Sequence, residues 1–143
     1  FGLAGLRVGY VIAHPSLILS INKVKNSKSI STFAQEGALA ALQDVTYMER
    51  YVSEVIKTRE NFKEMLQIIF GDNITINNSD ANYLMVNFKS LDIKKIVFKH
   101  LISDNIFVRD LQHINELQSS LRFTIGTKDQ MQKVTDSLNA ISL

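Results

Sequence analysis

The sequence predicts a mixed αβ protein whose second half is a small α+β layer, with one sheet covered by helices on one face. Two observations carry this prediction. Through most of the first half, apolar residues recur at spacings of three and four, which is typical of helices. After Gly71 they alternate with polar residues, which is typical of strands. The length of 143 residues fits one globular domain or a large piece of a bigger protein.

The first residues are apolar and rich in glycine. Residues 7–13 (RVGYVIA) are mostly β-branched, aromatic or small, and they predict a buried strand that ends at His14 and Pro15. Chain termini are usually polar and loosely held. We therefore expect that further protein precedes Phe1.

Three helices are predicted to follow. Residues 16–24 have a helical apolar stripe, and the Ala-rich stretch 32–42 is expected to be buried on more than one side. Thr46 and Glu49 have the spacing of a capping box, and the pattern behind them predicts a helix of about six turns that stops at Gly71.

The rest of the chain alternates strands and helices. Strands are predicted around 74–76 and 84–88, with Leu84, Val86 and Phe88 on the buried side. A helix over 90–103 follows, and Asn105 is expected to end it because Asn tolerates the left-handed conformation.

Two more strands are predicted over 106–109 and 121–125, the second with Arg122 on the face opposite Leu121, Phe123 and Ile125. Thr127 and Gln130 form a second capping-box pattern, and the apolar stripe behind them predicts a last helix up to about Ile141. Together these elements predict three parts. They are the end of a larger domain over 1–45, a connecting helix over 46–70, and a small α+β domain over 71–143.

Composition excludes several classes of function. The chain has no cysteine, so disulfides and thiolate zinc sites are excluded, and a reducing, cytoplasmic location is expected. His14, His100 and His113 lack metal-ligand spacing, so no metal site is predicted. The net charge of +2 is too small to indicate nucleic-acid binding, and no apolar run is long enough for a membrane helix. His100 and the lysines around it (Lys94, Lys95 and Lys99) are expected on a solvated helix face.

Three arginines stand in apolar or strand-like surroundings: Arg7, Arg109 and Arg122. A guanidinium group suits carboxylates and phosphates, because its planar fork donates two parallel hydrogen bonds. Two such arginines on neighbouring strands could hold a dianionic small molecule. The alternative is that each pairs with a nearby carboxylate of the chain.

Several motifs, in this order, resemble the class I/II aminotransferases, which are fold type I enzymes dependent on pyridoxal phosphate, and histidinol-phosphate aminotransferases most of all. The motifs are FGLAGLRVGY (1–10), Ala34-Gln35 leading into a helix that ends in ALQD (41–44), Ser79–Tyr83, IFVRD (106–110) and LRFTIGT (121–127). The resemblance covers essentially the whole chain. It implies the carboxy-terminal part of such an enzyme, with the end of the large domain, a connecting helix and a small domain with a mostly antiparallel sheet.

The resemblance also implies roles for single residues. Arg7 matches an arginine that contacts the cofactor phosphate, and Arg122 matches the one that binds the substrate α-carboxylate. Arg109 matches a position that helps to hold the substrate phosphate in the histidinol-phosphate enzymes. Gly2, Gly5 and Gly9 match positions where the backbone passes close to the cofactor. Asn105 departs from the family pattern, which has glycine before this strand.

A second departure concerns the Schiff-base lysine, which in this family lies two residues before the position of Phe1. None of the eleven lysines of this chain stands in a matching context. We therefore expect the chain alone to be inactive and to bind no cofactor. In the parent, a homodimer is expected to transfer an amino group between an amino acid or phosphorylated amine and a 2-oxo acid.

Other functions are compatible with the same residues. A relative that decarboxylates a phosphorylated amino acid would use similar arginines, and so would an aminotransferase of surface-polysaccharide or other secondary biosynthesis. A non-catalytic α+β module for subunit contact or ligand capture would need no lysine. The sequence encoded before Phe1 distinguishes the module from the enzymes.

Overall fold

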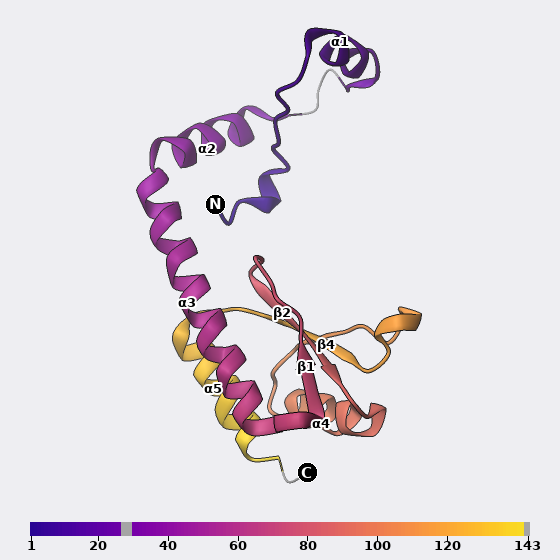
Figure 1. Ribbon diagram of the computed structural model, residues 1–143. Coiled ribbons are helices and arrows are strands. Elements are labelled where there is room, and N and C mark those ends of the chain that lie inside the picture. Colours follow the sequence, from indigo (N-terminus) through magenta and orange to yellow (C-terminus); the bar gives the residue numbers. More distant parts are fainter. Residues whose placement is uncertain (27–29, 142–143) are drawn as a thin grey trace. The chain divides into compact units, whose positions relative to one another are not determined.

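The computed structural model describes residues 1–26 and 30–141. The chain divides into two compact units, Phe1–Tyr51 and Val52–Leu143, and each is described by itself. Helices make up most of the first unit, whereas the second combines helices with a sheet (Figure 1).

The first unit begins with a single 3-10 turn, η1 (Ala4–Leu6), followed by helices α1 (Pro15–Val24) and α2 (Thr32–Gln43). Proline suits the first turn of α1, where its missing N–H is not needed. The Ser31 hydroxyl accepts a hydrogen bond from the Ala34 N–H at 3.2 Å, and so caps α2.

Two expectations for this unit are wrong. Residues 7–13 form no strand, and the described residues offer them no strand to pair with. A strand needs a hydrogen-bonding neighbour, which local sequence does not reveal. The predicted burial of the Ala-rich helix is also wrong, because Ala34 is its one buried residue and Phe33 is 89% exposed.

Helix α3 (Val45–Phe70) has 26 residues, about seven turns, and its range agrees with the predicted 46–70 within one residue. It does not start with the predicted Thr46 capping box. Instead, the Asp44 carboxylate accepts a hydrogen bond from the Tyr47 N–H at 3.1 Å, so the capping residue lies two positions before Thr46. The helix stops where predicted, since Gly71 has φ +50°.

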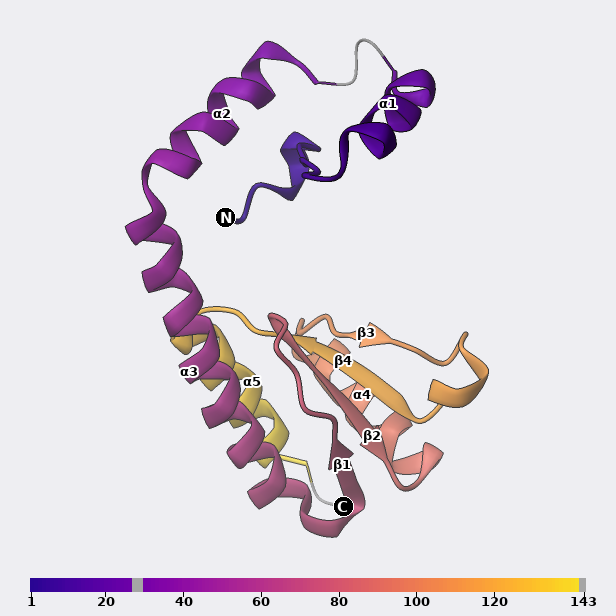
Figure 2. The same ribbon diagram turned by 45° about the horizontal axis from the view of Figure 1, so that its top comes forward.

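The second unit contains one antiparallel sheet of four strands in the order β1-β2-β4-β3. The strands are β1 (Ile74–Ile76), β2 (Tyr83–Phe88), β3 (Arg109–Asp110) and β4 (Ser120–Thr124). Helices α4 (Leu91–Ser103) and α5 (Lys128–Asn139) follow β2 and β4, as Figure 2 shows. Two 3-10 turns, η2 (Gly71–Asn73) and η3 (Asn115–Leu117), complete the unit. The strand predicted over 106–109 is wrong except at Arg109, because pairing with β4 begins only there.

The core lies between one face of the sheet and the helices. Its strand residues are those predicted to face inward, and the Phe62 and Phe123 rings, from α3 and β4, lie 5.6 Å apart. The predicted α+β layer is thereby confirmed. The buried apolar residues are Val55, Phe62, Leu66, Phe70, Ile74, Leu84, Val86, Phe88, Val97, Leu101, Leu121, Phe123, Ile125, Met131 and Leu138.

The predicted C-terminal end of α4 and the predicted start of α5 are confirmed in detail. Asn105 has φ +58°, its N–H donates to the Ile102 carbonyl at 3.0 Å, and the Ile106 N–H donates to the Leu101 carbonyl at 2.8 Å. This is the Schellman arrangement, which closes a helix with one left-handed residue. At the start of α5, Thr127 and Gln130 form the reciprocal capping box.

Replacing the exposed Asn105 tests this helix end. We expect Asn105→Ala to lower the free energy of unfolding by about 1–2 kcal/mol, because a Cβ without a polar side chain is strained at positive φ. Asn105→Gly should be at least as stable as the natural chain. Urea unfolding followed by circular dichroism measures both variants, and equal stability of the Ala and Gly variants would contradict the assignment.

Candidate functional site

The sheet has one face packed on helices and an opposite face, here called the open face, whose side chains are exposed or half-buried except for the buried Ser120. Alternation along β2 and β4, with the pairing of β3 to β4, places seven side chains on the open face. They are Tyr83, Met85, Asn87, Arg109, Ser120, Arg122 and Thr124. Two of the three arginines singled out in the sequence are therefore brought together here.

Arg109 and Arg122 stand directly opposite each other on β3 and β4. Two like charges in this position repel each other, so the pair is unfavourable unless an anion lies between them. Neither arginine has an ion pair with a carboxylate of the described residues. Asp110 faces the core side of the sheet and is bonded to Lys94 instead. Arg109 therefore does not form a local ion pair with the adjacent Asp110.

Arg122 is half-buried, and its Nε atom is buried without a hydrogen-bond partner within the described protein. Its Cζ atom lies 5.0 Å from the centroid of the Tyr83 ring, which is a cation–π contact. A buried N–H without an acceptor is costly. The site therefore provides a donor that an anionic ligand can satisfy.

A chain of hydrogen bonds crosses the same face beside the arginines. The Ser120 hydroxyl donates to the Asn87 carbonyl oxygen Oδ1 at 2.7 Å, and the Asn87 amide donates to Asn77 Oδ1 at 2.6 Å. These contacts use polar side chains of β4, β2 and the loop after β1. They tie the first residue of β4, two positions before Arg122, to β2 and to this loop.

Arg7 belongs to the first unit. Its side chain is exposed, and its backbone has φ +54°, where it closes η1 by donating its N–H to the Ala4 carbonyl at 3.2 Å. A non-glycine residue in this conformation is strained, and such strain is commonly found at functional sites. A Cβ built on Gly2, Gly5 or Gly9 would meet no atom within 4 Å, so the space beside this segment is open.

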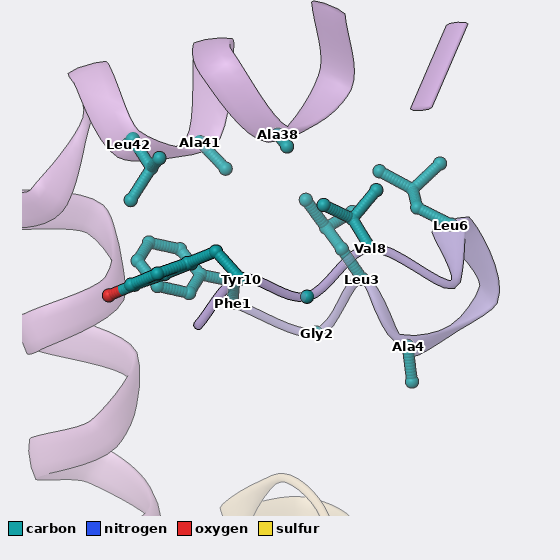
Figure 3. Close-up of a pocket in the computed structure, with 11 residues that line it drawn as sticks. Phe1, Gly2, Leu3, Ala4, Leu6, Val8, Tyr10, Ala38, Ala41 and Leu42 are labelled. Atoms are coloured by element: carbon teal, nitrogen blue, oxygen red, sulfur yellow. The ribbon is translucent and has the colours of Figure 1, made fainter. Parts of the chain in front are cut away.

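A pocket in the first unit lies between the amino-terminal stretch and α2 (Figure 3). Its lining side chains are apolar apart from the Tyr10 hydroxyl, so none of them is a charged group for acid–base chemistry or anion binding. The lining residues are Phe1, Gly2, Leu3, Ala4, Leu6, Val8, Gly9, Tyr10, Ala38, Ala41 and Leu42.

Three charged residues have roles that the sequence did not reveal. Lys94, expected to be solvated, is buried and pairs with Asp110, whereas Lys95 and Lys99 are exposed as expected. His100 is not simply solvated, because its Nε2 atom lies 2.9 Å from the Ser137 carbonyl oxygen of α5. Arg59 is buried in α3 and reaches the loop before β2. No pattern in the sequence marks these long-range contacts.

Two further observations concern metal ions and membranes. Across residues 1–26 and 30–141, no group of three His, Cys, Asp or Glu side chains is placed to hold a metal ion. Within the same ranges, no helix has both the length and the apolar character needed to cross a membrane.

Comparison with known proteins finds aminotransferases, both as a family model and as individual relatives. The family model for aminotransferase class I and II matches residues 1–138. Over 96% of its length, the chain is 35% identical to a dihydroxyacetone phosphate transaminase of Campylobacter jejuni, of which it covers 36%. It is 32% identical over 97% of its length to a histidinol-phosphate aminotransferase of Oceanobacillus iheyensis, of which it covers 39%.

Solved structures share the fold. A histidinol-phosphate aminotransferase of Sinorhizobium meliloti, in complex with pyridoxal phosphate, matches 96% of this chain with a TM-score of 0.78 and 23% identity. A decarboxylase of Sulfurospirillum multivorans matches 97% with a TM-score of 0.76 and 22% identity. The chain spans 37% and 40% of these two proteins. The family match over nearly the whole sequence, together with this shared fold, places the chain in the class I and II aminotransferase family.

Proposed function

We propose that this chain is the carboxy-terminal part of a pyridoxal-phosphate-dependent aminotransferase similar to histidinol-phosphate aminotransferases. The complete enzyme transfers an amino group between an amino acid or phosphorylated amine and a 2-oxo acid. It works in the cytoplasm as a homodimer, in amino-acid biosynthesis. The three parts proposed for the chain are the end of the large domain (1–45), the connecting helix (46–70) and the small domain (71–143).

The observation that carries this proposal is the pair of arginines on the open face of the sheet. Arg109 and Arg122 stand opposite each other without a carboxylate partner in the described chain, and Arg122 Nε has no acceptor. An amino-acid substrate carries a carboxylate, and a planar guanidinium fixes both its position and its direction. We assign the substrate carboxylate to Arg122.

A phosphorylated substrate supplies the second anion. We assign its phosphate to Arg109, whose exposed side chain shares the open face with Arg122. Two relatives, a dihydroxyacetone phosphate transaminase and a histidinol-phosphate aminotransferase, are both named for a phosphorylated compound. Those names support a phosphate-bearing substrate for the complete enzyme.

The residues of the first unit fit a role beside the cofactor. We assign a contact with the cofactor phosphate to Arg7, because its exposed guanidinium lies on a strained backbone segment with open space around the neighbouring glycines. When bound, pyridoxal phosphate supplies the electron sink that stabilises negative charge at the substrate Cα. The residues of this chain bind and orient the anionic groups around that centre.

The complete protein tests the proposed function. We expect it to transfer the amino group of histidinol phosphate, or of another amine or amino acid that carries a second anionic group, to a 2-oxo acid. A panel of such donors, with amino transfer and CO₂ release measured in parallel, separates transferase from decarboxylase. Release of CO₂ without amino transfer, or neither activity, would contradict the proposal.

The 143-residue chain alone is expected to show neither cofactor attachment nor amino transfer, because none of its eleven lysines stands in the context of a cofactor-binding lysine. Mass spectrometry after mixing with pyridoxal phosphate and borohydride measures attachment at each lysine. The complete protein is the matched positive control. Stoichiometric attachment to one specific lysine of the short chain would contradict this expectation.

A further inference from the structure

The segment Ala81–Tyr83 is held by its backbone at every residue. Its three successive carbonyl oxygens each accept a hydrogen bond. The Arg59 guanidinium donates to the Ala81 carbonyl at 2.9 Å, the Ile125 N–H donates to that of Asn82 at 2.8 Å, and the Ser79 hydroxyl donates to that of Tyr83 at 2.7 Å. Two of these donors are side chains. The position of Tyr83 therefore depends on residues outside the sheet.

Of these three donors, Arg59 is the one that belongs to a helix, α3. It is 6% exposed, and its Nε donates to the Glu60 carboxylate at 2.9 Å while its Nη1 reaches across 22 residues of sequence to Ala81. A buried guanidinium is rare, because removing it from water is costly. A plain packing role in α3 would be filled at lower cost by an apolar residue.

The held segment ends at the ring that contacts Arg122. Tyr83 is paired with Thr124 in the register, so it lies diagonally across from Arg122 on the same face. The ring restrains the guanidinium through its π face. Since the N–H groups of a guanidinium point outward in its own plane, this contact leaves the donors available to an anion.

We infer that Arg59 is a positioning residue of the anion site. By holding the Ala81 carbonyl, it keeps the Tyr83 ring over Arg122, and the ring keeps the Arg122 donors directed toward the bound anion. This inference rests on the proposed function, because it needs Arg122 to bind an anion. Ser79 supports the same segment through Tyr83 and through the Ala81 N–H, which donates to its hydroxyl at 3.1 Å.

Nuclear magnetic resonance of the 143-residue chain tests the inference without enzymatic activity. The chain has only five arginines, so its Nε–Hε signals are few, and the signal that Arg122→Lys removes is that of Arg122. The ring current of Tyr83 shifts this signal. Titration with acetate, a simple carboxylate, at constant ionic strength, then measures binding at the same atom.

Five variants separate positioning from general stability. Arg59→Met and Ser79→Ala each remove one donor to the segment, and Tyr83→Leu removes the ring. Tyr83→Phe keeps the ring. Arg50→Met is the matched control for Arg59→Met, because Arg50 is an exposed arginine of the same helix.

We expect Arg59→Met, Ser79→Ala and Tyr83→Leu to move the Arg122 signal toward that of an exposed arginine and to weaken acetate binding about fivefold. Tyr83→Phe and Arg50→Met should leave both readouts close to those of the natural chain. The inference is overturned if Arg59→Met and Ser79→Ala, both folded, keep the natural signal and affinity. If acetate leaves the Arg122 signal of the natural chain unmoved, the anion site and the proposed function fail first, and the inference falls with them.

Discussion

Replacing Arg122 by Lys in the complete enzyme is expected to lower kcat/KM by roughly 2–4 kcal/mol of transition-state stabilisation, which is about 30-fold to nearly 1,000-fold. Lysine keeps the positive charge but loses the planar fork. It also loses the flat group that contacts the Tyr83 ring. The substrate carboxylate would then be attracted but no longer held in one orientation.

The stability of the small domain should change little in the same variant. Arg122 lies on the open face, outside the apolar core, and it has no ion pair with a carboxylate of the described chain. Steady-state kinetics and thermal melting of Arg122→Lys beside the natural enzyme measure both effects, with Arg50→Lys as an exposed control. Unchanged kinetics with a large loss of stability would show that Arg122 is structural, and would reject its assignment to the substrate.

The second half of the chain could be predicted closely because its signals are local. Alternation separated the inward residues of β2 and β4 from the outward ones, and turn chemistry identified Asn105 and Thr127 as helix ends. Each of these features depends on residues within a few positions of each other. Alternation alone also placed Arg122 on the face opposite Leu121 and Phe123.

The first unit could not be predicted as well, because strands and buried faces depend on distant partners. Residues 7–13 have the composition of a strand but no described neighbour to pair with. Large apolar side chains such as Tyr10, Ile12 and Phe33 are exposed. Composition indicates that a segment is suited to burial, and it does not identify what covers it.

The candidate site was only partly predictable for the same reason. Three arginines could be singled out from their apolar surroundings, but the register that sets Arg109 opposite Arg122 is a property of the folded sheet. The contacts of Arg59 with Ala81 and of Lys94 with Asp110 span 22 and 16 residues. On a helix, a buried charged residue and a solvated one have the same local pattern.

The ion pair of Lys94 with Asp110 is expected to be the most sensitive point of the small domain. The side chain of Lys94 is 1% exposed, and its Nζ atom lies 2.5 Å from Asp110 Oδ1 and 5.6 Å from the centroid of the Phe98 ring. Asp110 Oδ1 also accepts the Gln112 N–H at 2.9 Å, so the carboxylate is held from two sides. A buried ammonium left without its carboxylate is strongly unfavourable.

We expect Asp110→Asn to lower the free energy of unfolding by about 3–5 kcal/mol, because it leaves the Lys94 charge buried and unpaired. Lys94→Met should cost less, since it removes the buried charge and leaves Asp110, at 19% exposure, partly in contact with water. The double variant Lys94→Met/Asp110→Asn should recover part of the loss, because neither buried charge remains. Lys95→Met, on the exposed face of the same helix, should be neutral.

Urea unfolding of the four variants gives the coupling energy directly. A loss below about 1 kcal/mol for Asp110→Asn would mean that the ammonium finds water or another acceptor, and the pair would then contribute little to folding.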